Sequence, residues 1–306
     1  MNGHGGHGPP VLVGVDPGTQ GGGVGDIVRF AAREAQLHRT ALRLLHVVDR
    51  TERAPAPAEG GLPEQAGAGV LAPYSALVRA EFPGLDVAEH TEPGKPASVL
   101  VTRSGEGAMI VLGHRGHGGF PRLPLGSVAL QVATNARCPV VVVRPAPAER
   151  DAPVVVGFDL PEDSLDALEF ACTEAGARGA PLEIVHADFH PQVLPPGMAP
   201  PGQTDQGEIV RAERQFLEAE AAQVRERHPG LTVRVRVAHT NATSALLAAG
   251  ADAALLVVGT HQRSALARLL LGSVAGEVLH RARCPVAVVP KAGTGTRTGA
   301  GTEEAG

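Results

Sequence analysis

A glycine-rich loop stands between an apolar run and a helix-like stretch in the first half of the chain. Gly113-His114-Arg115-Gly116 directly follows the apolar residues 109–112, and nine residues separate Gly116 from the pair Gly126-Ser127. Glycines let backbone N–H groups approach an anion closely, and the first turn of a helix supplies unpaired N–H donors and a favourable dipole. The spacing therefore predicts a loop that binds phosphate.

The same signals occur a second time, which indicates an internal duplication. Arg137-Cys138-Pro139-Val140 recurs as Arg283-Cys284-Pro285-Val286, and the matched residues of the two copies are 140 to 146 positions apart throughout. Because the order of the signals is kept, chance recurrence is a poor explanation. The matched pairs are, in chain order, Asp16 and Asp159, His46 and His186, Gly113 and Gly259, Gly126 and Gly272, and Cys138 and Cys284.

Each copy is expected to alternate strands with helices. In the first copy, apolar or alternating runs predict strands at residues 11–16, 42–48, 85–90, 108–113 and 140–144. Helical spacing predicts helices at residues 26–38, 70–81, 96–103 and 126–136. The second copy repeats this order, with a longer helix at residues 208–228. We therefore expect an α/β fold of two tandem doubly wound domains, each a five-stranded parallel sheet sandwiched by helices. Ligands bind such sheets at the carboxyl ends of the strands, where Asp16, Val47 and Gly113 are predicted to lie.

The expected domains cover residues 11–146 and 153–290, and residues 147–152 form a short linker. Residues 1–10 and 291–306 are rich in small residues and are expected to be disordered. A glycine-rich turn at residues 17–23 directly follows Asp16. It is either a further phosphate-facing loop or a loose insertion, and the sequence leaves both open.

The composition bounds the partners of the protein. The 306 residues are 43% hydrophobic and 19% charged, with a net charge of −5, 3% aromatic residues and no Trp. Because there is no basic field and no set of stacking rings, nucleic acid is not an expected partner. No apolar run reaches the length of a membrane span and no secretory signal is evident, so we expect no membrane contact. Three cysteines form no disulfide framework, and a cytoplasmic location is predicted.

The combined pattern resembles that of the ATP-binding universal stress proteins. The first copy has all the fixed positions of the Gly-x-x-Gly, nine residues, Gly-Ser motif, and the Val-Gly-Val-Asp and Leu-Leu-His-Val segments also resemble that family. The resemblance extends over roughly residues 10–290, so the chain is similar to a tandem-domain member. It implies an ATP-binding regulator of the stress response, with Mg²⁺ as the accompanying ion. In that family the last strands of two domains pair with each other. The resemblance therefore implies pairing within this chain and leaves further homo-oligomerisation open.

The resemblance also assigns a nucleotide site to the first copy. Its aspartate would lie near the ribose and the metal-bearing phosphates, its valine would line the adenine pocket, and its loop glycines would pass beneath ribose and phosphates. The residues at the helix start would offer N–H groups to the phosphate tail, while His114, Arg115, His117 and Arg122 would add positive charge. The assigned residues are Asp16, Val47, Gly113, Gly116, Gly126, Ser127 and Val128.

The second copy departs from the motif and is expected to bind nucleotide weakly or not at all. Gln262 replaces the second glycine, where a side chain would obstruct a close approach, and Ala187 replaces the adenine-side valine. The corresponding residues of this weaker site are Asp159, Ala187, Gly259, Gly272, Ser273 and Val274.

Other interpretations compete with the nucleotide site. Ser127 could be an ordinary helix cap and Asp16 a turn residue, and His46, His186 and the cysteines are expected to be buried structural residues. No general base stands beside a nucleophile and no zinc spacing is evident, so binding is favoured over catalysis. The alternatives are a nucleotide-free interaction scaffold and a slow adenine-nucleotide hydrolase or transferase that uses His114, Arg115 or His117.

Overall fold

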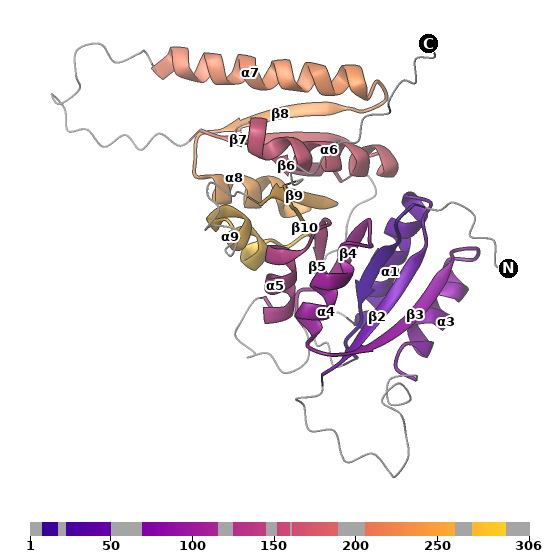
Figure 1. Ribbon diagram of the computed structural model, residues 1–306. Coiled ribbons are helices and arrows are strands. Elements are labelled where there is room, and N and C mark those ends of the chain that lie inside the picture. The colour runs from indigo at the N-terminus through magenta and orange to yellow at the C-terminus, as the bar shows by residue number, and fades with distance from the viewer. Residues whose placement is uncertain are drawn as a thin grey trace, which may run out of the picture.

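Ten strands form a single sheet flanked by helices. The computed structural model describes residues 8–17, 23–49, 69–115, 125–144, 152–159, 161–188, 206–260 and 271–291. The strand order across the sheet is β3-β2-β1-β4-β5-β10-β9-β6-β7-β8, so each half of the chain supplies one half of the sheet (Figure 1). The predicted α/β fold with two doubly wound domains is confirmed.

Within its described residues, the first domain contains five parallel strands and four helices. They are β1 (Val11–Gly14), α1 (Val24–Leu37), β2 (Leu42–Val48), α3 (Ala72–Glu81), β3 (Val87–Pro93), α4 (Pro96–Arg103), β4 (Met109–Gly113), α5 (Ser127–Asn135) and β5 (Val140–Val143). The predicted ends differ from these by a few residues. The largest difference is at β3, which was predicted to end at residue 90. Its pairing with β2 continues to the match of Val48 with Pro93, so pairing with its neighbour decides where it ends.

The second domain repeats the same order of strands. It contains β6 (Val154–Gly157), α6 (Pro161–Arg178), β7 (Leu182–Ala187), α7 (Gln206–Arg227), β8 (Val233–Ala238), α8 (Ala242–Ala249), a short 3₁₀ turn η1 (Gly250–Asp252), β9 (Leu255–Gly259), α9 (Ser273–Arg281) and β10 (Val286–Val289). These strands are also parallel to one another.

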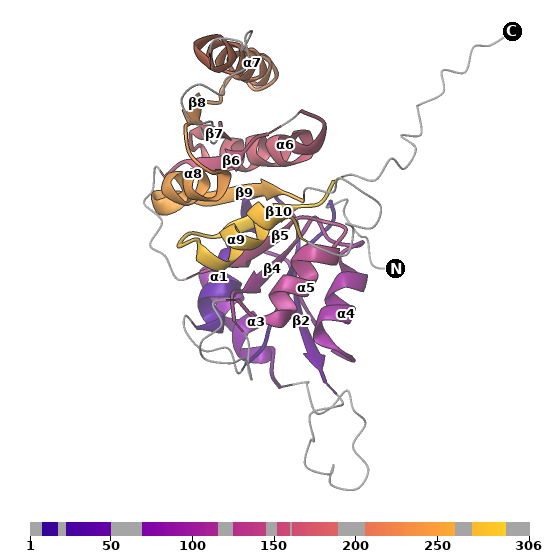
Figure 2. The ribbon, with the colours of Figure 1, turned by 90° about the vertical axis from the view of Figure 1, so that its left-hand side faces the viewer.

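Two apolar layers hold the sheet between helices. The continuous valine and leucine runs of the central strands are buried on both faces, as in other parallel sheets covered by helices. One layer packs under α1, α3, α6 and α7, and the other packs under α4, α5, α8 and α9. The second group of helices lies on the left in Figure 1 and faces the viewer in Figure 2.

The two domains join at the strands that end each copy. β5 and β10 pair antiparallel, with Val141 opposite Ala287 at the centre of the register. These two residues are matched positions of the duplication, 146 residues apart. An approximate twofold axis therefore passes between them, and the predicted pairing of the terminal strands within the chain is confirmed.

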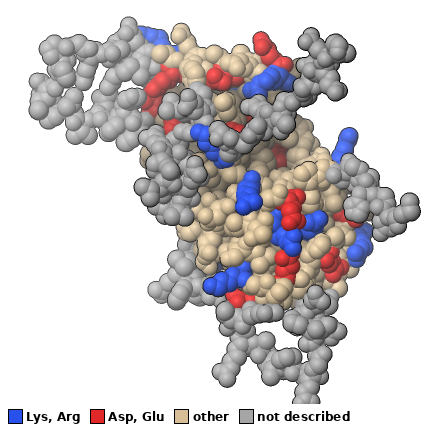
Figure 3. Space-filling view, in the orientation of Figure 1, with Lys and Arg blue, Asp and Glu red and all other residues tan. Residues whose placement is uncertain are grey.

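Two surface properties complete the description. None of the helices formed by the described residues combines the length and apolar character that a membrane crossing needs. On the face shown in Figure 3, basic and acidic side chains are interspersed and form no continuous positive surface.

Candidate functional site

Strand register relates two of the predicted site residues of the first domain, Asp16 and Val47. Gly14 of β1 pairs with Leu45 of β2, and the N–H of Val15 donates to the Leu45 carbonyl at 2.9 Å just beyond the end of β1. Continued for two residues, this register sets Asp16 level with Val47. The site therefore begins at the carboxyl edge of the sheet, as expected for a doubly wound fold.

A histidine holds the turn that carries Asp16. Nδ1 of His46 lies 2.9 Å from the carbonyl oxygen of Val15. Because a carbonyl oxygen only accepts hydrogen bonds, Nδ1 carries the proton in this contact. His186 makes the same contact with the carbonyl oxygen of Phe158 in the second domain, also at 2.9 Å. Both histidines thus have one ring nitrogen that bonds a backbone carbonyl, as expected of structural residues, but they are half-buried and not fully buried as predicted.

The two ends of the glycine loop are joined by a hydrogen bond next to the end of β4. His114 donates its N–H to the Val143 carbonyl at 3.2 Å, and Gly126 donates its N–H to the His114 carbonyl at 2.8 Å. This second bond closes the base of the loop and brings the start of α5 next to the end of β4. Gly126 is the residue that precedes α5, and it has no side chain with which to cap the helix. Ser127 and Val128 therefore offer their N–H groups in the first turn of an uncapped helix, which is a suitable position for an anion.

Gly113 is required by packing. A Cβ atom at this position would lie 2.6 Å from Cδ1 of Ile27 in α1 and 3.3 Å from the Arg115 carbonyl oxygen. The absence of a side chain lets α1 approach the end of β4 closely. The glycine motif thus has a structural basis as well as the proposed role toward phosphate.

The positive charge at this edge differs from the sequence-based expectation. Burial, together with the charges of Arg144 and Arg115, lowers the pKa of His114. The imidazole is therefore mainly neutral near pH 7, and the expectation that His114 adds positive charge to the loop is wrong. Arg144, which directly follows β5, was missed because it lies far from the motif in the chain. The adjacency of β4 and β5, with His114 bonded to Val143, brings it to the loop.

The second domain keeps the framework and changes the site. By the same register, Asp159 is level with Ala187, and Asp159 donates its N–H to the Ser164 hydroxyl oxygen of α6 at 3.1 Å. Gly272 precedes α9 as Gly126 precedes α5, so Ser273 and Val274 begin that helix. Gly259 ends β9. Within the described residues, no bond from Gly272 to Thr260 repeats the one that closes the first loop. Pro290 stands at the position of Arg144.

Several predicted features lie outside the described residues. These are Gly116, His117, Arg122, Gln262 and most of the turn at 17–23. A cavity of about 150 Å³ lies elsewhere, over the sheet face beside α4. Its polar residues are Arg43, His90, Glu92 and Arg103. Arg103 pairs with Glu92 at 2.8 Å and Arg43 pairs with Glu106 at 3.3 Å, so acidic partners balance the guanidinium groups of this cavity.

The cysteines have no features of nucleophiles. All three are buried and unbridged, and burial raises the pKa of Cys138 to about 12 and those of Cys172 and Cys284 to about 11. The thiols therefore remain protonated at neutral pH and act as small apolar side chains.

Comparison with known proteins identifies the family. The model of the universal stress protein family matches residues 9–144 and again residues 152–290. Universal stress protein Rv2005c of Mycobacterium tuberculosis is 33% identical over 292 residues, which cover 91% of this chain and 96% of that protein. A universal stress protein structure from Archaeoglobus fulgidus superposes with a TM-score of 0.65 and 18% identity, over 92% of this chain and 96% of that one. Two shorter family structures match with TM-scores of 0.34 and 0.32 over 45% and 43% of this chain. One was solved with cAMP, and the other, also from Archaeoglobus fulgidus, with dAMP. This chain belongs to the universal stress protein family and carries two domains of that family in tandem.

Proposed function

We propose that the protein is a regulator of the stress response that binds ATP mainly in its first domain. One observation carries this proposal: the hydrogen bond from Gly126 to His114 brings the uncapped start of α5 to the sheet edge where Asp16 and Val47 lie. A phosphate tail at the start of α5 would receive N–H donors, with the cationic side chains of Arg115 and Arg144 nearby.

Magnesium fits the same residues. The Asp16 carboxylate and the Ser127 hydroxyl are oxygen donors, which is the ligand type that Mg²⁺ prefers together with phosphate oxygens. When bound, the ion would neutralise part of the triphosphate charge. Binding is favoured over turnover because the sequence sets no general base beside a nucleophile, and the start of α5 offers N–H donors that would position phosphate without activating it.

The experiment is a calorimetric titration with ATP and Mg²⁺, together with mass spectrometry of any nucleotide that copurifies. We expect one nucleotide per chain. ADP, AMP and cAMP serve as additional probes of the preferred phosphate number. A wild-type protein that shows no saturable heat with any of them would contradict the proposal and favour a nucleotide-free scaffold.

A matched pair of variants tests which domain binds. Gly126 has backbone angles of φ −75° and ψ 150°, which an aspartate adopts without strain. Gly126→Asp should cap α5 with its own carboxylate, leave the fold intact and abolish binding by repelling phosphate. Gly272→Asp makes the same change before α9 and should leave binding unchanged. Equal losses in both variants would contradict the predicted difference between the domains.

A further inference from the structure

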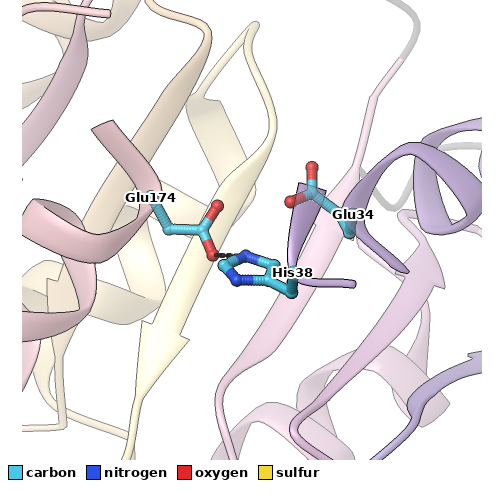
Figure 4. Close-up of side chains that lie close together, drawn as sticks. All are labelled: Glu34, His38 and Glu174. Carbon is cyan, nitrogen blue, oxygen red and sulfur yellow. Dashed lines mark hydrogen bonds and ion pairs between the residues drawn. The ribbon is translucent and has the colours of Figure 1, made fainter. Parts of the chain in front are cut away.

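A buried ionic cluster joins the two domains on the helix side of the sheet opposite α5 and α9. We call Glu34, His38, Glu174 and Arg178 the interdomain cluster. Glu34 lies in α1 and His38 follows its end, while Glu174 and Arg178 lie in the last part of α6. Figure 4 shows His38 directed at Glu174 across the space between the helices, with the Glu34 carboxylate directed toward the same space. The Glu34 and Glu174 side chains are only 3% and 1% exposed.

The interdomain cluster follows the approximate twofold symmetry of the molecule. Glu34 and Glu174 are matched positions, 140 residues apart, and so are His38 and Arg178. Arg178 donates to Glu34 across the interface, and Nε2 of His38 lies 2.8 Å from Oε1 of Glu174, also across the interface. Each contact thus joins the glutamate of one domain to the basic residue of the other, but one basic residue is a permanent cation and the other is a titratable imidazole.

The two glutamates differ in their hydrogen bonds, because one of the matched positions holds a histidine and the other an arginine. Glu174 has both carboxylate oxygens engaged, because Arg178 also donates to its Oε2. Glu34 has a contact at Oε1 only, and its Oε2 is buried with no hydrogen-bond partner among the described residues. Two carboxylates share one permanent cation, so the buried group is electrically neutral only when it also holds one proton.

We propose that the interdomain cluster holds one exchangeable proton, shared between Glu34 and His38, and that its loss weakens the interface between the domains. The protein would then be most firmly assembled in mildly acidic solution, and its two halves would become less tightly held as the solution turns alkaline.

The direction of the titration agrees with this geometry. Burial raises the pKa of Glu34 to about 7, and the hydrogen bond to Glu174 raises that of His38 above its ordinary value. Burial acts to raise the pKa of Glu174, but His38 and Arg178 together hold it below its ordinary value. A folded state that binds a proton more tightly than the unfolded chain loses stability as the pH rises through the folded pKa. The loss is therefore expected between about pH 5 and pH 8.

Among the described residues, the sheet side of the cluster supplies no competing charge, and a metal ion is a weaker explanation. The strands under α1 and α6 present apolar side chains to this layer, including Val111, Val141 and Ala287. The possible ligand atoms of Glu34, His38 and Glu174 lie within 4.8 Å of one another. However, the guanidinium of Arg178 already bridges the two carboxylates, so a divalent ion would face a fixed positive charge.

The test uses urea denaturation from pH 5.5 to pH 8 to compare the pH dependence of unfolding in the wild type, Glu34→Gln and Glu81→Gln. Glu34→Gln replaces the carboxyl group by a neutral group of the same shape. It should reduce the pH dependence that the cluster causes, because Arg178 then balances the one remaining carboxylate without a proton. In the wild type this dependence amounts to at most about a tenfold change in the unfolding equilibrium constant per pH unit. Glu81→Gln is the matched control, because Glu81 pairs with Arg29 on the surface and has a lowered pKa. It should keep the wild-type pH dependence.

The matched glutamate gives the sharpest outcome. Glu174→Gln removes the carboxylate that both cations need, so it should destabilise the protein throughout this pH range, whereas Glu34→Gln should make it more stable than wild type at pH 8. If Glu174→Gln does not fold, the comparison of Glu34→Gln with Glu81→Gln still tests whether the cluster causes the pH dependence. An unchanged pH dependence in Glu34→Gln would overturn the proposal. Stabilisation of wild type by added Zn²⁺ that Glu34→Gln abolishes would also overturn it, in favour of a metal site.

Discussion

The residues of the glycine loop differ in how far the sequence could predict them. Gly113 was identified from its motif, but the sequence could not show that Ile27 of α1 fills the space of its missing side chain, because that contact joins two separate elements. His114 was expected to carry charge, and burial beside Arg144 lowers its pKa instead. Arg144 was missed altogether. A residue's type and spacing thus predicted a site, while its charge state depended on neighbours that only the fold brings together.

Two glycine-to-alanine changes should have opposite effects on stability. Gly113→Ala places a Cβ against Ile27 and should lower the free energy of unfolding by about 1–3 kcal/mol, the usual cost of overpacking. Gly276→Ala lies in α9 with open space around it, so it should raise that free energy by about 0.5–1 kcal/mol. Urea denaturation of both variants measures the difference. A loss of stability in Gly276→Ala as large as in Gly113→Ala would show that these local contacts do not decide the outcome.

At the scale of elements, the strands were easier to predict than their ends. The valine-rich runs of β4, β5 and β9 predict buried strands because such runs suit strands covered on both faces. β3 has weak apolar character, so its true extent followed from pairing with β2 and could not be read from its own residues. The interdomain cluster was also invisible in the sequence, since its members become neighbours only when α1 and α6 meet across the approximate twofold axis.

One arginine connects the elements of the two domains on the opposite side of the sheet. Arg144, directly after β5, donates to the carbonyl oxygens of Leu279 and His280 in the last turn of α9, the latter at 3.3 Å. A cation at this position is favourable because the carboxyl end of a helix carries unpaired carbonyl groups and a partial negative charge.

Arg144→Met should therefore loosen α9 and lower the free energy of unfolding by about 1–3 kcal/mol. Faster amide hydrogen exchange in the last turn of α9 would localise the effect. Arg281→Met is the control, because this side chain is 61% exposed and its ion pair with Glu277 is long, at 3.8 Å. Its effect should stay within about 0.5 kcal/mol. Equal hydrogen exchange in the two variants would show that Arg144 does not hold the end of α9.

At the scale of the whole molecule, the described residues make three sets of contacts between the halves in addition to the apolar layers that both halves share. They are the β5–β10 pairing, the interdomain cluster and the contact of Arg144 with α9. None of them depends on the chain connection through residues 145–151, which lies outside the described residues. The duplication was evident from the sequence, but the sequence alone could not show the strength of these contacts.

A chain cut within residues 145–151, at an introduced protease site, should therefore remain one particle. Size-exclusion chromatography with light scattering should give the mass of the uncut protein at micromolar concentration. The same cut in the Glu174→Gln variant should release the halves more readily, because a buried guanidinium and a histidine then lack their shared partner. Separation of the cut wild-type halves in native buffer would show that covalent linkage is needed.

The pairing of β5 with β10 also decides which sheet edges meet solvent. The outer strands, β3 and β8, carry exposed charged side chains such as Glu89, Arg234 and Arg236, which discourage addition of another strand. The inner strands have no such protection, since β5 is made of four valines and β10 of three valines and one alanine. An isolated domain would expose one of these uncharged edges, which is the kind of strand that starts aggregation. Each half of the chain thus acts as the permanent cover that keeps the other half from assembling with copies of itself.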